Sequence, residues 1–442
     1  MQLQGQPAAI PSMQEQDMDS PIRHSSESRP AGNSGAAGGQ AEGDAVGKIV
    51  LFVPDITDVS TIKRAESFIE YGYRLLIFGF RRKRYNRNFN PDWPYVLLGQ
   101  TKDGRYIQRL WALIMALPAM VAHRRHLREA SIFYARNIDQ LMLALIANLL
   151  VRGRRRIVYE VLDVQPIFTG GGFASRLLRL VERFGLRRVE LLVLSSPGFL
   201  RNYFHPTQHY RRPWFLLENK LSADFWNQRQ RLRSNDNQLR SARKQQRQDY
   251  RWVVGYCGLI RGQETFDLIV RLAEQLQGIV LFKFRGILTT VDRKFFDAAV
   301  ARLDNLVFEG DYVSPHDLET VYGDIDFAWA LDLENTEHNS RWLLPCRFYE
   351  AGYFGVPCLA AKGFEVGSMI DTAGIGWSFA EDYEHHLLEF FRSLTRPAYE
   401  ARRQRLLELP TTRFVAGEDI VSLCRILEGE VQQRDKAEPL RA

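Results

Sequence analysis

The sequence predicts an α/β protein built from two doubly wound, Rossmann-like domains, and three observations support this. Short apolar runs alternate with amphipathic segments, the pattern of parallel strands joined by helices. A polar segment rich in Gln, Arg and Asn, residues 221–250, interrupts the alternation, which then restarts at Trp252. Two such domains joined by a linker predict a ligand cleft that faces the C-terminal ends of both sheets.

Composition places the domain boundaries. The first 46 residues are rich in Gly, Ala, Ser, Gln and Pro and hold few large apolar side chains, so we expect a disordered tail there. The chain has 442 residues, of which 45% are hydrophobic and 12% aromatic, enough for two packed cores. The expected division is a tail at 1–46, a first domain at 47–220, a linker at 221–250, a second domain at 251–430 and a tail at 431–442.

The first domain opens with a continuous apolar run that ends at Pro54 and Asp55, typical of a strand buried on both faces. Further apolar runs follow, each separated from the next by an amphipathic segment. The expected strands are 48–53, 74–79, 95–98, 130–134, 156–160 and 190–195. The expected helices are 61–71, 106–128, 138–151, 174–184 and 197–203.

The same alternation defines the second domain. Its expected strands are 252–257, 279–284, 306–309, 326–330, 356–360 and 376–379. Its expected helices are 265–276, 292–303, 315–322 and 347–353. Three terminal helices are expected at 383–394, 397–409 and 417–427. The sequence leaves open whether these last helices cap the second domain or cross back over the first.

The net charge of +7 and the pI of about 9.2 fit anionic partners of three kinds: nucleic acid, a phospholipid surface or phosphorylated substrates. The four cysteines show no metal-binding spacing and are expected to be reduced, as in a cytoplasmic protein. No signal peptide is visible. The longest uncharged runs, 110–122 and 140–151, have 13 and 12 residues, fewer than the roughly 20 that span a bilayer.

The segment 339–360 has the most specific pattern in the chain: a loop, a short helix, a tight stop and a buried strand. Pro345 suits the first helical position, where its missing N–H has no cost. Gly355 suits the left-handed position just past the helix end. The apolar residues expected to pack on the domain from one face of this helix are Leu344, Phe348 and Ala351.

Two charged residues of the same helix, Arg347 and Glu350, are three positions apart and can address one ligand together. No capping side chain precedes Pro345, so the first-turn N–H groups predict an anion site, with a phosphate as the usual occupant. Asn339 and Ser340 lie just before the helix and could complete such a phosphate cradle. The alternative is that Glu350 is a solvated surface residue, as most charged side chains are.

This pattern of Pro345, Arg347 and Glu350 followed by Gly355 resembles the nucleotide-sugar signature of "group 1" GT-B glycosyltransferases. The longer string that begins at Asn339 is similar, more narrowly, to the ExoL-type glycosyltransferases of succinoglycan biosynthesis. The resemblance implies that Glu350 holds the ribose hydroxyls of the donor. Many members carry a second Glu eight residues earlier, whereas this chain has Trp342 there. Donor-sugar contacts of that Glu therefore do not carry over.

Other residues of the second domain fit the same donor site. Gly258 and Arg261 follow the first strand, where related enzymes hold the donor pyrophosphate on a Gly-x-x-Arg/Lys loop. Arg285 ends the next strand, near the expected position of the base. Residues 308–315 resemble the base-binding turn of the family. The alternative for Gly258 and Arg261 is a plain turn with a solvated Arg, and the alternative for 308–315 is a strand-to-helix loop.

The first domain is expected to bind the acceptor and, if the reaction inverts, to supply a general base at the end of a strand. Asp163 is well placed, and relatives carry His or Asp chemistry after the equivalent strand. Asp55, Asp58 and Asp139 also follow strand ends, and each could equally be a helix cap or a loop acid. Arg136, directly after a strand, is a candidate phosphate contact.

Basic residues gather in the first domain. Nine Arg against three acids lie between positions 152 and 188. Arg124, Arg125 and Arg128 lie near the apolar part of the helix expected at 106–128, which carries Trp111, Leu113 and Met120. Apolar side chains rimmed by Arg can settle on an anionic leaflet. A core helix beside solvated arginines is the equal alternative.

Together, the resemblance implies a glycosyltransferase that moves a hexose from a nucleotide diphosphate sugar, with UDP-glucose expected, to a lipid-linked oligosaccharide in exopolysaccharide biosynthesis. The enzyme would work in the cytoplasm at the inner face of the plasma membrane. No cofactor is expected, and no metal, since no carboxylate pair of DxD spacing sits at a strand end. Three alternatives stay open: a nucleotide-sugar epimerase, a nucleotide-sugar-binding protein without turnover and, with no motif in its favour, a nucleic-acid-binding protein.

Overall fold

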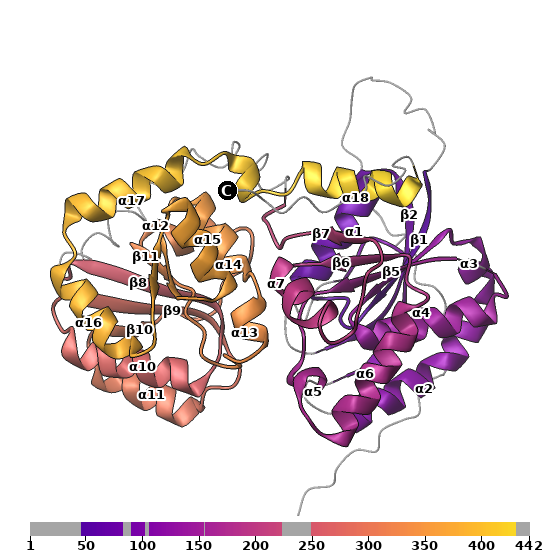
Figure 1. Cartoon of the computed structure of the whole chain (residues 1–442), viewed down its shortest axis with the longest axis horizontal. Coiled ribbons are helices and arrows are strands. Elements are labelled where there is room, and N and C mark those ends of the chain that lie inside the picture. The colour runs from indigo at the N-terminus through magenta and orange to yellow at the C-terminus, as the bar shows by residue number, and fades with distance from the viewer. Residues whose placement is uncertain (1–45, 83–89, 102–105, 154, 223–248, 430–442) are drawn as a thin grey trace, which may run out of the picture.

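The computed structural model describes residues 46–82, 90–101, 106–153, 155–222 and 249–429. The tails expected at 1–46 and 431–442, apart from Val46, and most of the expected linker lie outside these ranges. The described residues form two parallel sheets, each covered by helices on both faces (Figure 1). The predicted fold class of two doubly wound domains is confirmed.

Within the described residues, the first sheet has seven parallel strands in the order β3-β2-β1-β4-β5-β6-β7. Strand β1 is central and pairs with both β2 and β4, which explains why every residue from Ile49 to Val53 is fully buried. The strands are β1 Gly47–Val53, β2 Tyr73–Arg81, β3 Tyr95–Gln100, β4 Ile132–Arg136, β5 Arg156–Val161, β6 Leu191–Leu194 and β7 Trp214–Leu216.

Helices fill the connections of the first sheet. The single helix predicted at 106–128 is wrong, because the chain leaves helical geometry at His123 and forms two helices. Strand β7 and the short α5 were not predicted. The helices are α1 Val59–Glu70, α2 Tyr106–Ala122, α3 Arg124–Glu129, α4 Ile138–Leu150, α5 Pro166–Thr169, α6 Phe173–Leu186 and α7 Pro197–Phe199, followed by the π-helical turn η1 Leu200–Phe204.

The second sheet repeats the topology of the first. Its strands are parallel in the order β10-β9-β8-β11-β12-β13, so β8 takes the central place of β1. The strands are β8 Trp252–Ile260, β9 Val280–Leu288, β10 Leu306–Phe308, β11 Phe327–Trp329, β12 Cys358–Ala361 and β13 Trp377–Phe379. The helices before the C-terminal region are α10 Gln263–Gln275, α11 Arg293–Arg302, α12 Leu318–Gly323, α13 Asn339–Trp342, α14 Cys346–Tyr353 and α15 Glu365–Ala373.

The terminal helices divide between the domains. Helices α16 Tyr383–Ser393 and α17 Arg396–Glu408 stay on the second domain, whereas α18 Glu418–Glu428 crosses to the first (Figure 1). Leu423, Cys424 and Leu427 of α18 are buried in the same cluster as the residues of β1. Part of the range expected for the second domain therefore packs on the first.

Three of the four cysteines are buried, Cys346 is exposed, and all four are free. No helix in the described part of the chain is long and apolar enough to cross a membrane.

Candidate functional site

Helix α14 lies in the second domain, where the segment 339–360 was predicted to form a ligand site. It begins at Cys346, with Pro345 at the N-cap and without a capping side chain. Gly355 adopts the predicted left-handed conformation, with φ of 68°. The predicted apolar face is confirmed, since Leu344, Phe348 and Ala351 are all buried in one core cluster.

The carboxylate of Glu350 is buried on this helix and is only 6% exposed, contrary to the solvated alternative. Tyr322 of α12 donates its hydroxyl to Glu350 Oε2 at 2.8 Å. Burial, followed by the charge of Glu350, raises the pKa of the Tyr322 phenol well above its usual value, so the hydroxyl remains a donor. The Tyr322 ring stacks on Phe354 at 5.7 Å between centroids. Glu350 is therefore held by a rigid neighbour.

Arg347 turns toward the sheet rather than toward a partner shared with Glu350. Its guanidinium donates to the carbonyl oxygens of Trp329 at 3.2 Å and Leu259 at 3.1 Å. It also lies over the ring of Tyr256, 4.4 Å from the centroid. These contacts tie the ends of β8 and β11 to α14.

The glycine of the expected pyrophosphate loop lies inside a strand. Strand β8 continues past Cys257 to Ile260, and Gly258 pairs directly with Gly286 of β9. Both glycines have positive φ, 100° and 124°, and a Cβ on Gly286 would lie 1.9 Å from the Gly258 carbonyl oxygen. A Cβ on Gly258 would lie 3.8 Å from the Tyr312 hydroxyl, an ordinary van der Waals distance, so the positive φ and not a lack of space favours glycine there.

Arg261, directly after β8, is bound by two carboxylates. Its guanidinium contacts Asp332 at 2.6 Å and Glu334 at 3.6 Å. Burial alone would lower the pKa of Arg261, but the charge of Asp332 and the hydrogen bond to it together raise that pKa. A phosphate that binds Arg261 would have to compete with Asp332.

Arg285 belongs to an ion-pair network on the face of the sheet that α12 and α14 cover. It pairs with Glu309, and Lys283 contacts Glu309 at 3.2 Å and Asp324 at 2.7 Å. Arg285 lies opposite Cys257 across the strands, and the charges of both Arg285 and Glu350 act on that cysteine.

The residues before α14 contact the first domain. Asn339 Oδ1 accepts a hydrogen bond of 3.0 Å from the N–H of Val164. The carbonyl oxygen of Trp342 accepts from the hydroxyl of Ser196, and the Trp342 side chain packs into the apolar core of the first domain. Ser340 is buried, and its hydroxyl has no hydrogen-bond partner. Trp342, which stands where many relatives carry a Glu, thus forms part of the contact between the domains.

This contact brings the predicted base toward the second domain. Asp163 follows β5 and precedes Val164, whose N–H binds Asn339. Asp163 is exposed and lines a pocket with Asn137, Gln165 and the buried Glu182. The fold therefore places Asp163 next to Val164, which contacts Asn339 of the expected donor site. Asp58 also lies near the second domain, because its charge acts on Cys346 at the start of α14.

Two of the rival carboxylates serve local structure. Asp55 accepts from the N–H and hydroxyl of Thr57 at 3.0 and 2.8 Å, and burial raises its pKa. Asp58 caps α1, where it accepts from the N–H groups of Ser60 and Thr61. Both match the cap and loop alternatives.

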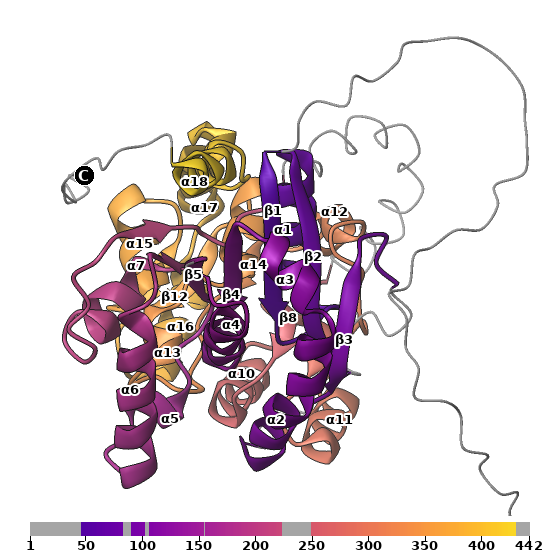
Figure 2. The ribbon, with the colours of Figure 1, turned by 90° about the vertical axis from the view of Figure 1, so that its right-hand side faces the viewer.

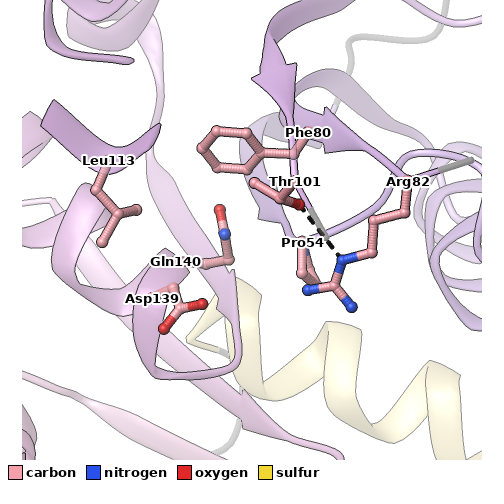
Figure 3. A pocket seen from close by; sticks show the side chains of 7 residues that line it. All are labelled: Pro54, Phe80, Arg82, Thr101, Leu113, Asp139 and Gln140. Atoms are coloured by element: carbon pink, nitrogen blue, oxygen red, sulfur yellow. Dashed lines mark hydrogen bonds between the residues drawn. The ribbon is translucent and has the colours of Figure 1, made fainter. Parts of the chain in front are cut away.

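Asp139, the third rival, lines a different pocket at the C-terminal edge of the first sheet. Figure 3 shows this pocket between the ends of β1 and β2 and the start of α4. Arg82 donates its Nε to the Thr101 hydroxyl at 3.4 Å there. Gln140 is 1% exposed, and its carbonyl oxygen has no hydrogen-bond partner. In the described part of the first domain, two pockets thus lie at the start of α4, each lined by both polar and apolar residues.

Sequence reasoning missed three residues that shape the donor side: Tyr322, which positions Glu350, Tyr256, which lies under Arg347, and Asp332, which binds Arg261. A tyrosine on a short helix has no signal that distinguishes it from a core residue, so Tyr322 was not identifiable. Among the described residues, no group of three or more His, Cys, Asp or Glu side chains could hold a metal ion.

The fold is similar to that of several solved structures. HepE from Anabaena, in complex with UDP and glucose, matches with a TM-score of 0.64 and 14% identity over 86% of this chain and 99% of its own. Sucrose-phosphate synthase from Thermosynechococcus elongatus matches with a TM-score of 0.63 and 13% identity, over 87% of this chain and 99% of its own. WaaG, a glycosyltransferase of lipopolysaccharide biosynthesis, matches with a TM-score of 0.57 and 13% identity, over 86% of this chain and 99% of its own. The fold is that of the GT-B glycosyltransferases.

No family model matches the chain. Among curated proteins, the succinoglycan biosynthesis protein ExoL of Rhizobium meliloti is 30% identical over 330 residues, which cover 74% of this chain and 80% of ExoL. The chain belongs to the ExoL family of GT-B glycosyltransferases.

Proposed function

We propose that this enzyme transfers a hexose from a nucleotide diphosphate sugar, with UDP-glucose as the donor, to a lipid-linked oligosaccharide in exopolysaccharide biosynthesis. Membership of the ExoL family supports the pathway, because the relative is a succinoglycan biosynthesis protein. HepE, whose fold is similar, was crystallised with UDP and with UDP-glucose, which supports the donor.

The observation that carries the donor site is the environment of Glu350. Glu350 is buried, and Tyr322 donates to one of its oxygens. The charge of Glu350 also acts on Tyr312, whose hydroxyl lies near Gly258. An ionised carboxylate in this position can accept hydrogen bonds from vicinal ribose hydroxyls. We assign the ribose to Glu350.

The other groups have roles that follow from their places around β8. Arg261 and Arg347, with the backbone at Gly258, would stabilise the diphosphate as it leaves. Arg285 would lie toward the base. Asn339 and Ser340 would lie toward the contact with the first domain, where Asp163 would accept the proton of the acceptor hydroxyl.

The enzyme would act in the cytoplasm, at the inner face of the plasma membrane. A polyprenyl-linked or other lipid-linked acceptor is confined to that surface, so the acceptor reaches the first domain from the bilayer. The basic composition of the chain, with a net charge of +7, supports contact with an anionic leaflet.

Replacing the carboxylate tests the donor site. We expect Glu350→Gln to weaken UDP binding about 10- to 100-fold, since hydrogen bonds to a charged group contribute about 1.5–3 kcal/mol. Isothermal calorimetry with UDP, GDP and ADP measures both the loss and the base preference. The matched control is Glu400→Gln on the exposed side of α17, which should bind UDP as the native chain does. Native affinity in Glu350→Gln would refute the assignment.

The hydroxyl that holds Glu350 gives a milder test. Tyr322→Phe keeps the ring on Phe354 but removes the hydrogen bond to Glu350. We expect UDP affinity to fall about 3- to 10-fold, because a net hydrogen bond contributes about 1 kcal/mol. Calorimetry under the same conditions measures this change. When Tyr322→Phe is added to Glu350→Gln, UDP affinity should fall almost no further, because both substitutions disrupt the same hydrogen-bonded pair. Fully additive losses would show that Tyr322 acts elsewhere.

A further inference from the structure

Helix α6, Phe173–Leu186, carries its apolar face on the outside. Five of its large apolar side chains are between 37% and 83% exposed and lie at helical spacing, so they form one stripe, whereas Leu178 and Leu186 pack on the core of the first domain. The side chains of this stripe are Phe173, Leu177, Leu180, Val181 and Phe184.

The opposite face of the same helix buries polar side chains alongside Leu186. Glu182 points inward, where it accepts from the Tyr159 hydroxyl at 3.0 Å and from Gln208 at 2.7 Å. Ser175 is buried on this face as well. A surface helix of a globular protein normally buries its apolar face and exposes the polar one. Helix α6 departs from this rule, because it buries a charged side chain and leaves most of its large apolar side chains exposed, so the stripe indicates an interaction surface.

The packing of α6 fixes this orientation. Gly185 lies against α4, where an added Cβ would come within 3.1 Å of both Leu141 and Met142. The guanidinium of Arg179 donates to the carbonyl oxygens of Phe168 and Gly170 at 2.9 and 2.7 Å. These contacts hold the polar face inward and leave the stripe outward.

The charges along α6 select the partner. Arg176, Arg187 and Arg188 are exposed at or beside the helix, whereas its one acid, Glu182, is buried. A symmetric contact between two copies through this face would bring the arginines of both copies together, which is unfavourable. An anionic lipid leaflet accepts both the apolar stripe and the arginines.

A second apolar face lies nearby on α2. Trp111 and Met115 are exposed there, and α2 and α6 both pack on α4. Both views show α2 and α6 at the lower side of the first domain, with α4 between them in Figure 2 (Figures 1 and 2).

We propose that α6, with α2 beside it, is a docking surface for an anionic phospholipid bilayer. The stripe would lie among the acyl chains near the headgroups, and Arg176, Arg187 and Arg188 would contact lipid phosphates. The inner face of α6 contributes Glu182 to the pocket of Asp163, so a docked enzyme holds that pocket directly behind the membrane contact. The link to acceptor delivery rests on the proposed function, whereas the surface rests on α6 itself.

Vesicle co-sedimentation tests this proposal with the full chain. Vesicles of phosphatidylcholine alone are compared with vesicles that contain phosphatidylglycerol in addition. We expect binding to the anionic vesicles, weakening with added salt because the charge contribution is screened. The double variant Leu177→Gln/Phe184→Gln should bind at least about tenfold more weakly, because it removes apolar area that inserts into the bilayer.

The matched control removes the same side-chain types from the second domain. Leu407 and Phe295 are 47% and 45% exposed, on α17 and α11, and their double Gln variant should bind vesicles like the native chain. Calorimetry with UDP on all variants keeps the donor site separate, because a failure of UDP binding bears on the proposed function and not on this surface.

Three results would overturn the proposal. The native chain could ignore the anionic vesicles, or the two double variants could lose binding equally. Light scattering could also show a dimer that only Leu177→Gln/Phe184→Gln dissociates, which would make the stripe an interface between copies.

Discussion

Asp163→Asn is expected to lower the rate of sugar transfer about 10²- to 10⁴-fold, the usual contribution of a positioned general base. The amide has nearly the shape of the carboxylate but cannot take the proton of the acceptor hydroxyl. UDP affinity should stay within about twofold of native, because the expected donor groups belong to the second domain. Release of UDP from UDP-glucose, measured with a membrane fraction that supplies lipid-linked acceptor, gives the rate.

Asp139→Asn provides the control, because Asp139 lines the other pocket of the first domain. It should leave the rate near native if Asp163 is the base. A loss confined to Asp139→Asn would transfer the role to the pocket of Figure 3. If neither substitution slows transfer, the enzyme uses no carboxylate base from these positions, as expected for a reaction with retention at the sugar.

The sheets were predictable because their central strands are apolar throughout. In β1 and β8, burial on both faces selects runs of Val, Leu, Ile and aromatic residues. Such runs predict a strand from its own sequence, without knowledge of the strands that pair with it. Sequence could not predict where β8 and β9 end. Gly258 and Gly286 look like strand terminators separately, but they pair with each other and let both strands continue.

The candidate site was only partly predictable. Glu350 was identified from local spacing and resemblance, since both depend on one short segment. Trp342 is different, because its role depends on the first domain, more than a hundred residues away, into whose core it packs. Arg347 likewise contacts backbone carbonyls that no spacing reveals.

The destination of α18 was open for a related reason. An amphipathic helix specifies that one face is buried, but not which surface buries it. Tyr73 donates its hydroxyl to the carbonyl oxygen of Cys424 at 3.4 Å, and Arg156 donates to that of Ile426 at 3.2 Å. Both partners come from the first domain, so the crossing was decided by tertiary contacts.

Arg136 shows how a buried network can resemble a functional site. The expected phosphate contact is 1% exposed and instead donates to Glu160 Oε2 at 2.9 Å and to the Thr61 hydroxyl at 2.9 Å. Arg64 donates to Glu160 Oε1 at 2.8 Å. One buried carboxylate thus forms ion pairs with two guanidinium groups.

Removing that carboxylate should have a large effect on stability. We expect Glu160→Gln to lower the free energy of unfolding of the first domain by about 3–5 kcal/mol, because Arg64 and Arg136 stay buried without a counter-charge. Urea denaturation followed by circular dichroism measures the loss. The matched control is Glu190→Gln, which removes a half-exposed partner of Arg156 and should cost less than about 1 kcal/mol. Equal losses in both variants would contradict the role of the network.

The pH dependence of the stability difference between the native chain and Glu160→Gln tests whether the charge of Glu160 causes it. Burial of Glu160 works against ionisation, but the charges of Arg136 and Arg64 outweigh it and lower the pKa from 4.5 to about 2. A carboxyl group whose pKa is lower in the folded state contributes stability that is fully present above pH 4.5 and is lost as the pH falls toward 2. The gap in unfolding free energy between native and Glu160→Gln should therefore narrow over this window, while the gap for Glu190→Gln stays small throughout. A gap that persists unchanged at the acid end would show that the Glu160→Gln substitution destabilises the domain through altered packing, and that the two arginines do not depend on the charge.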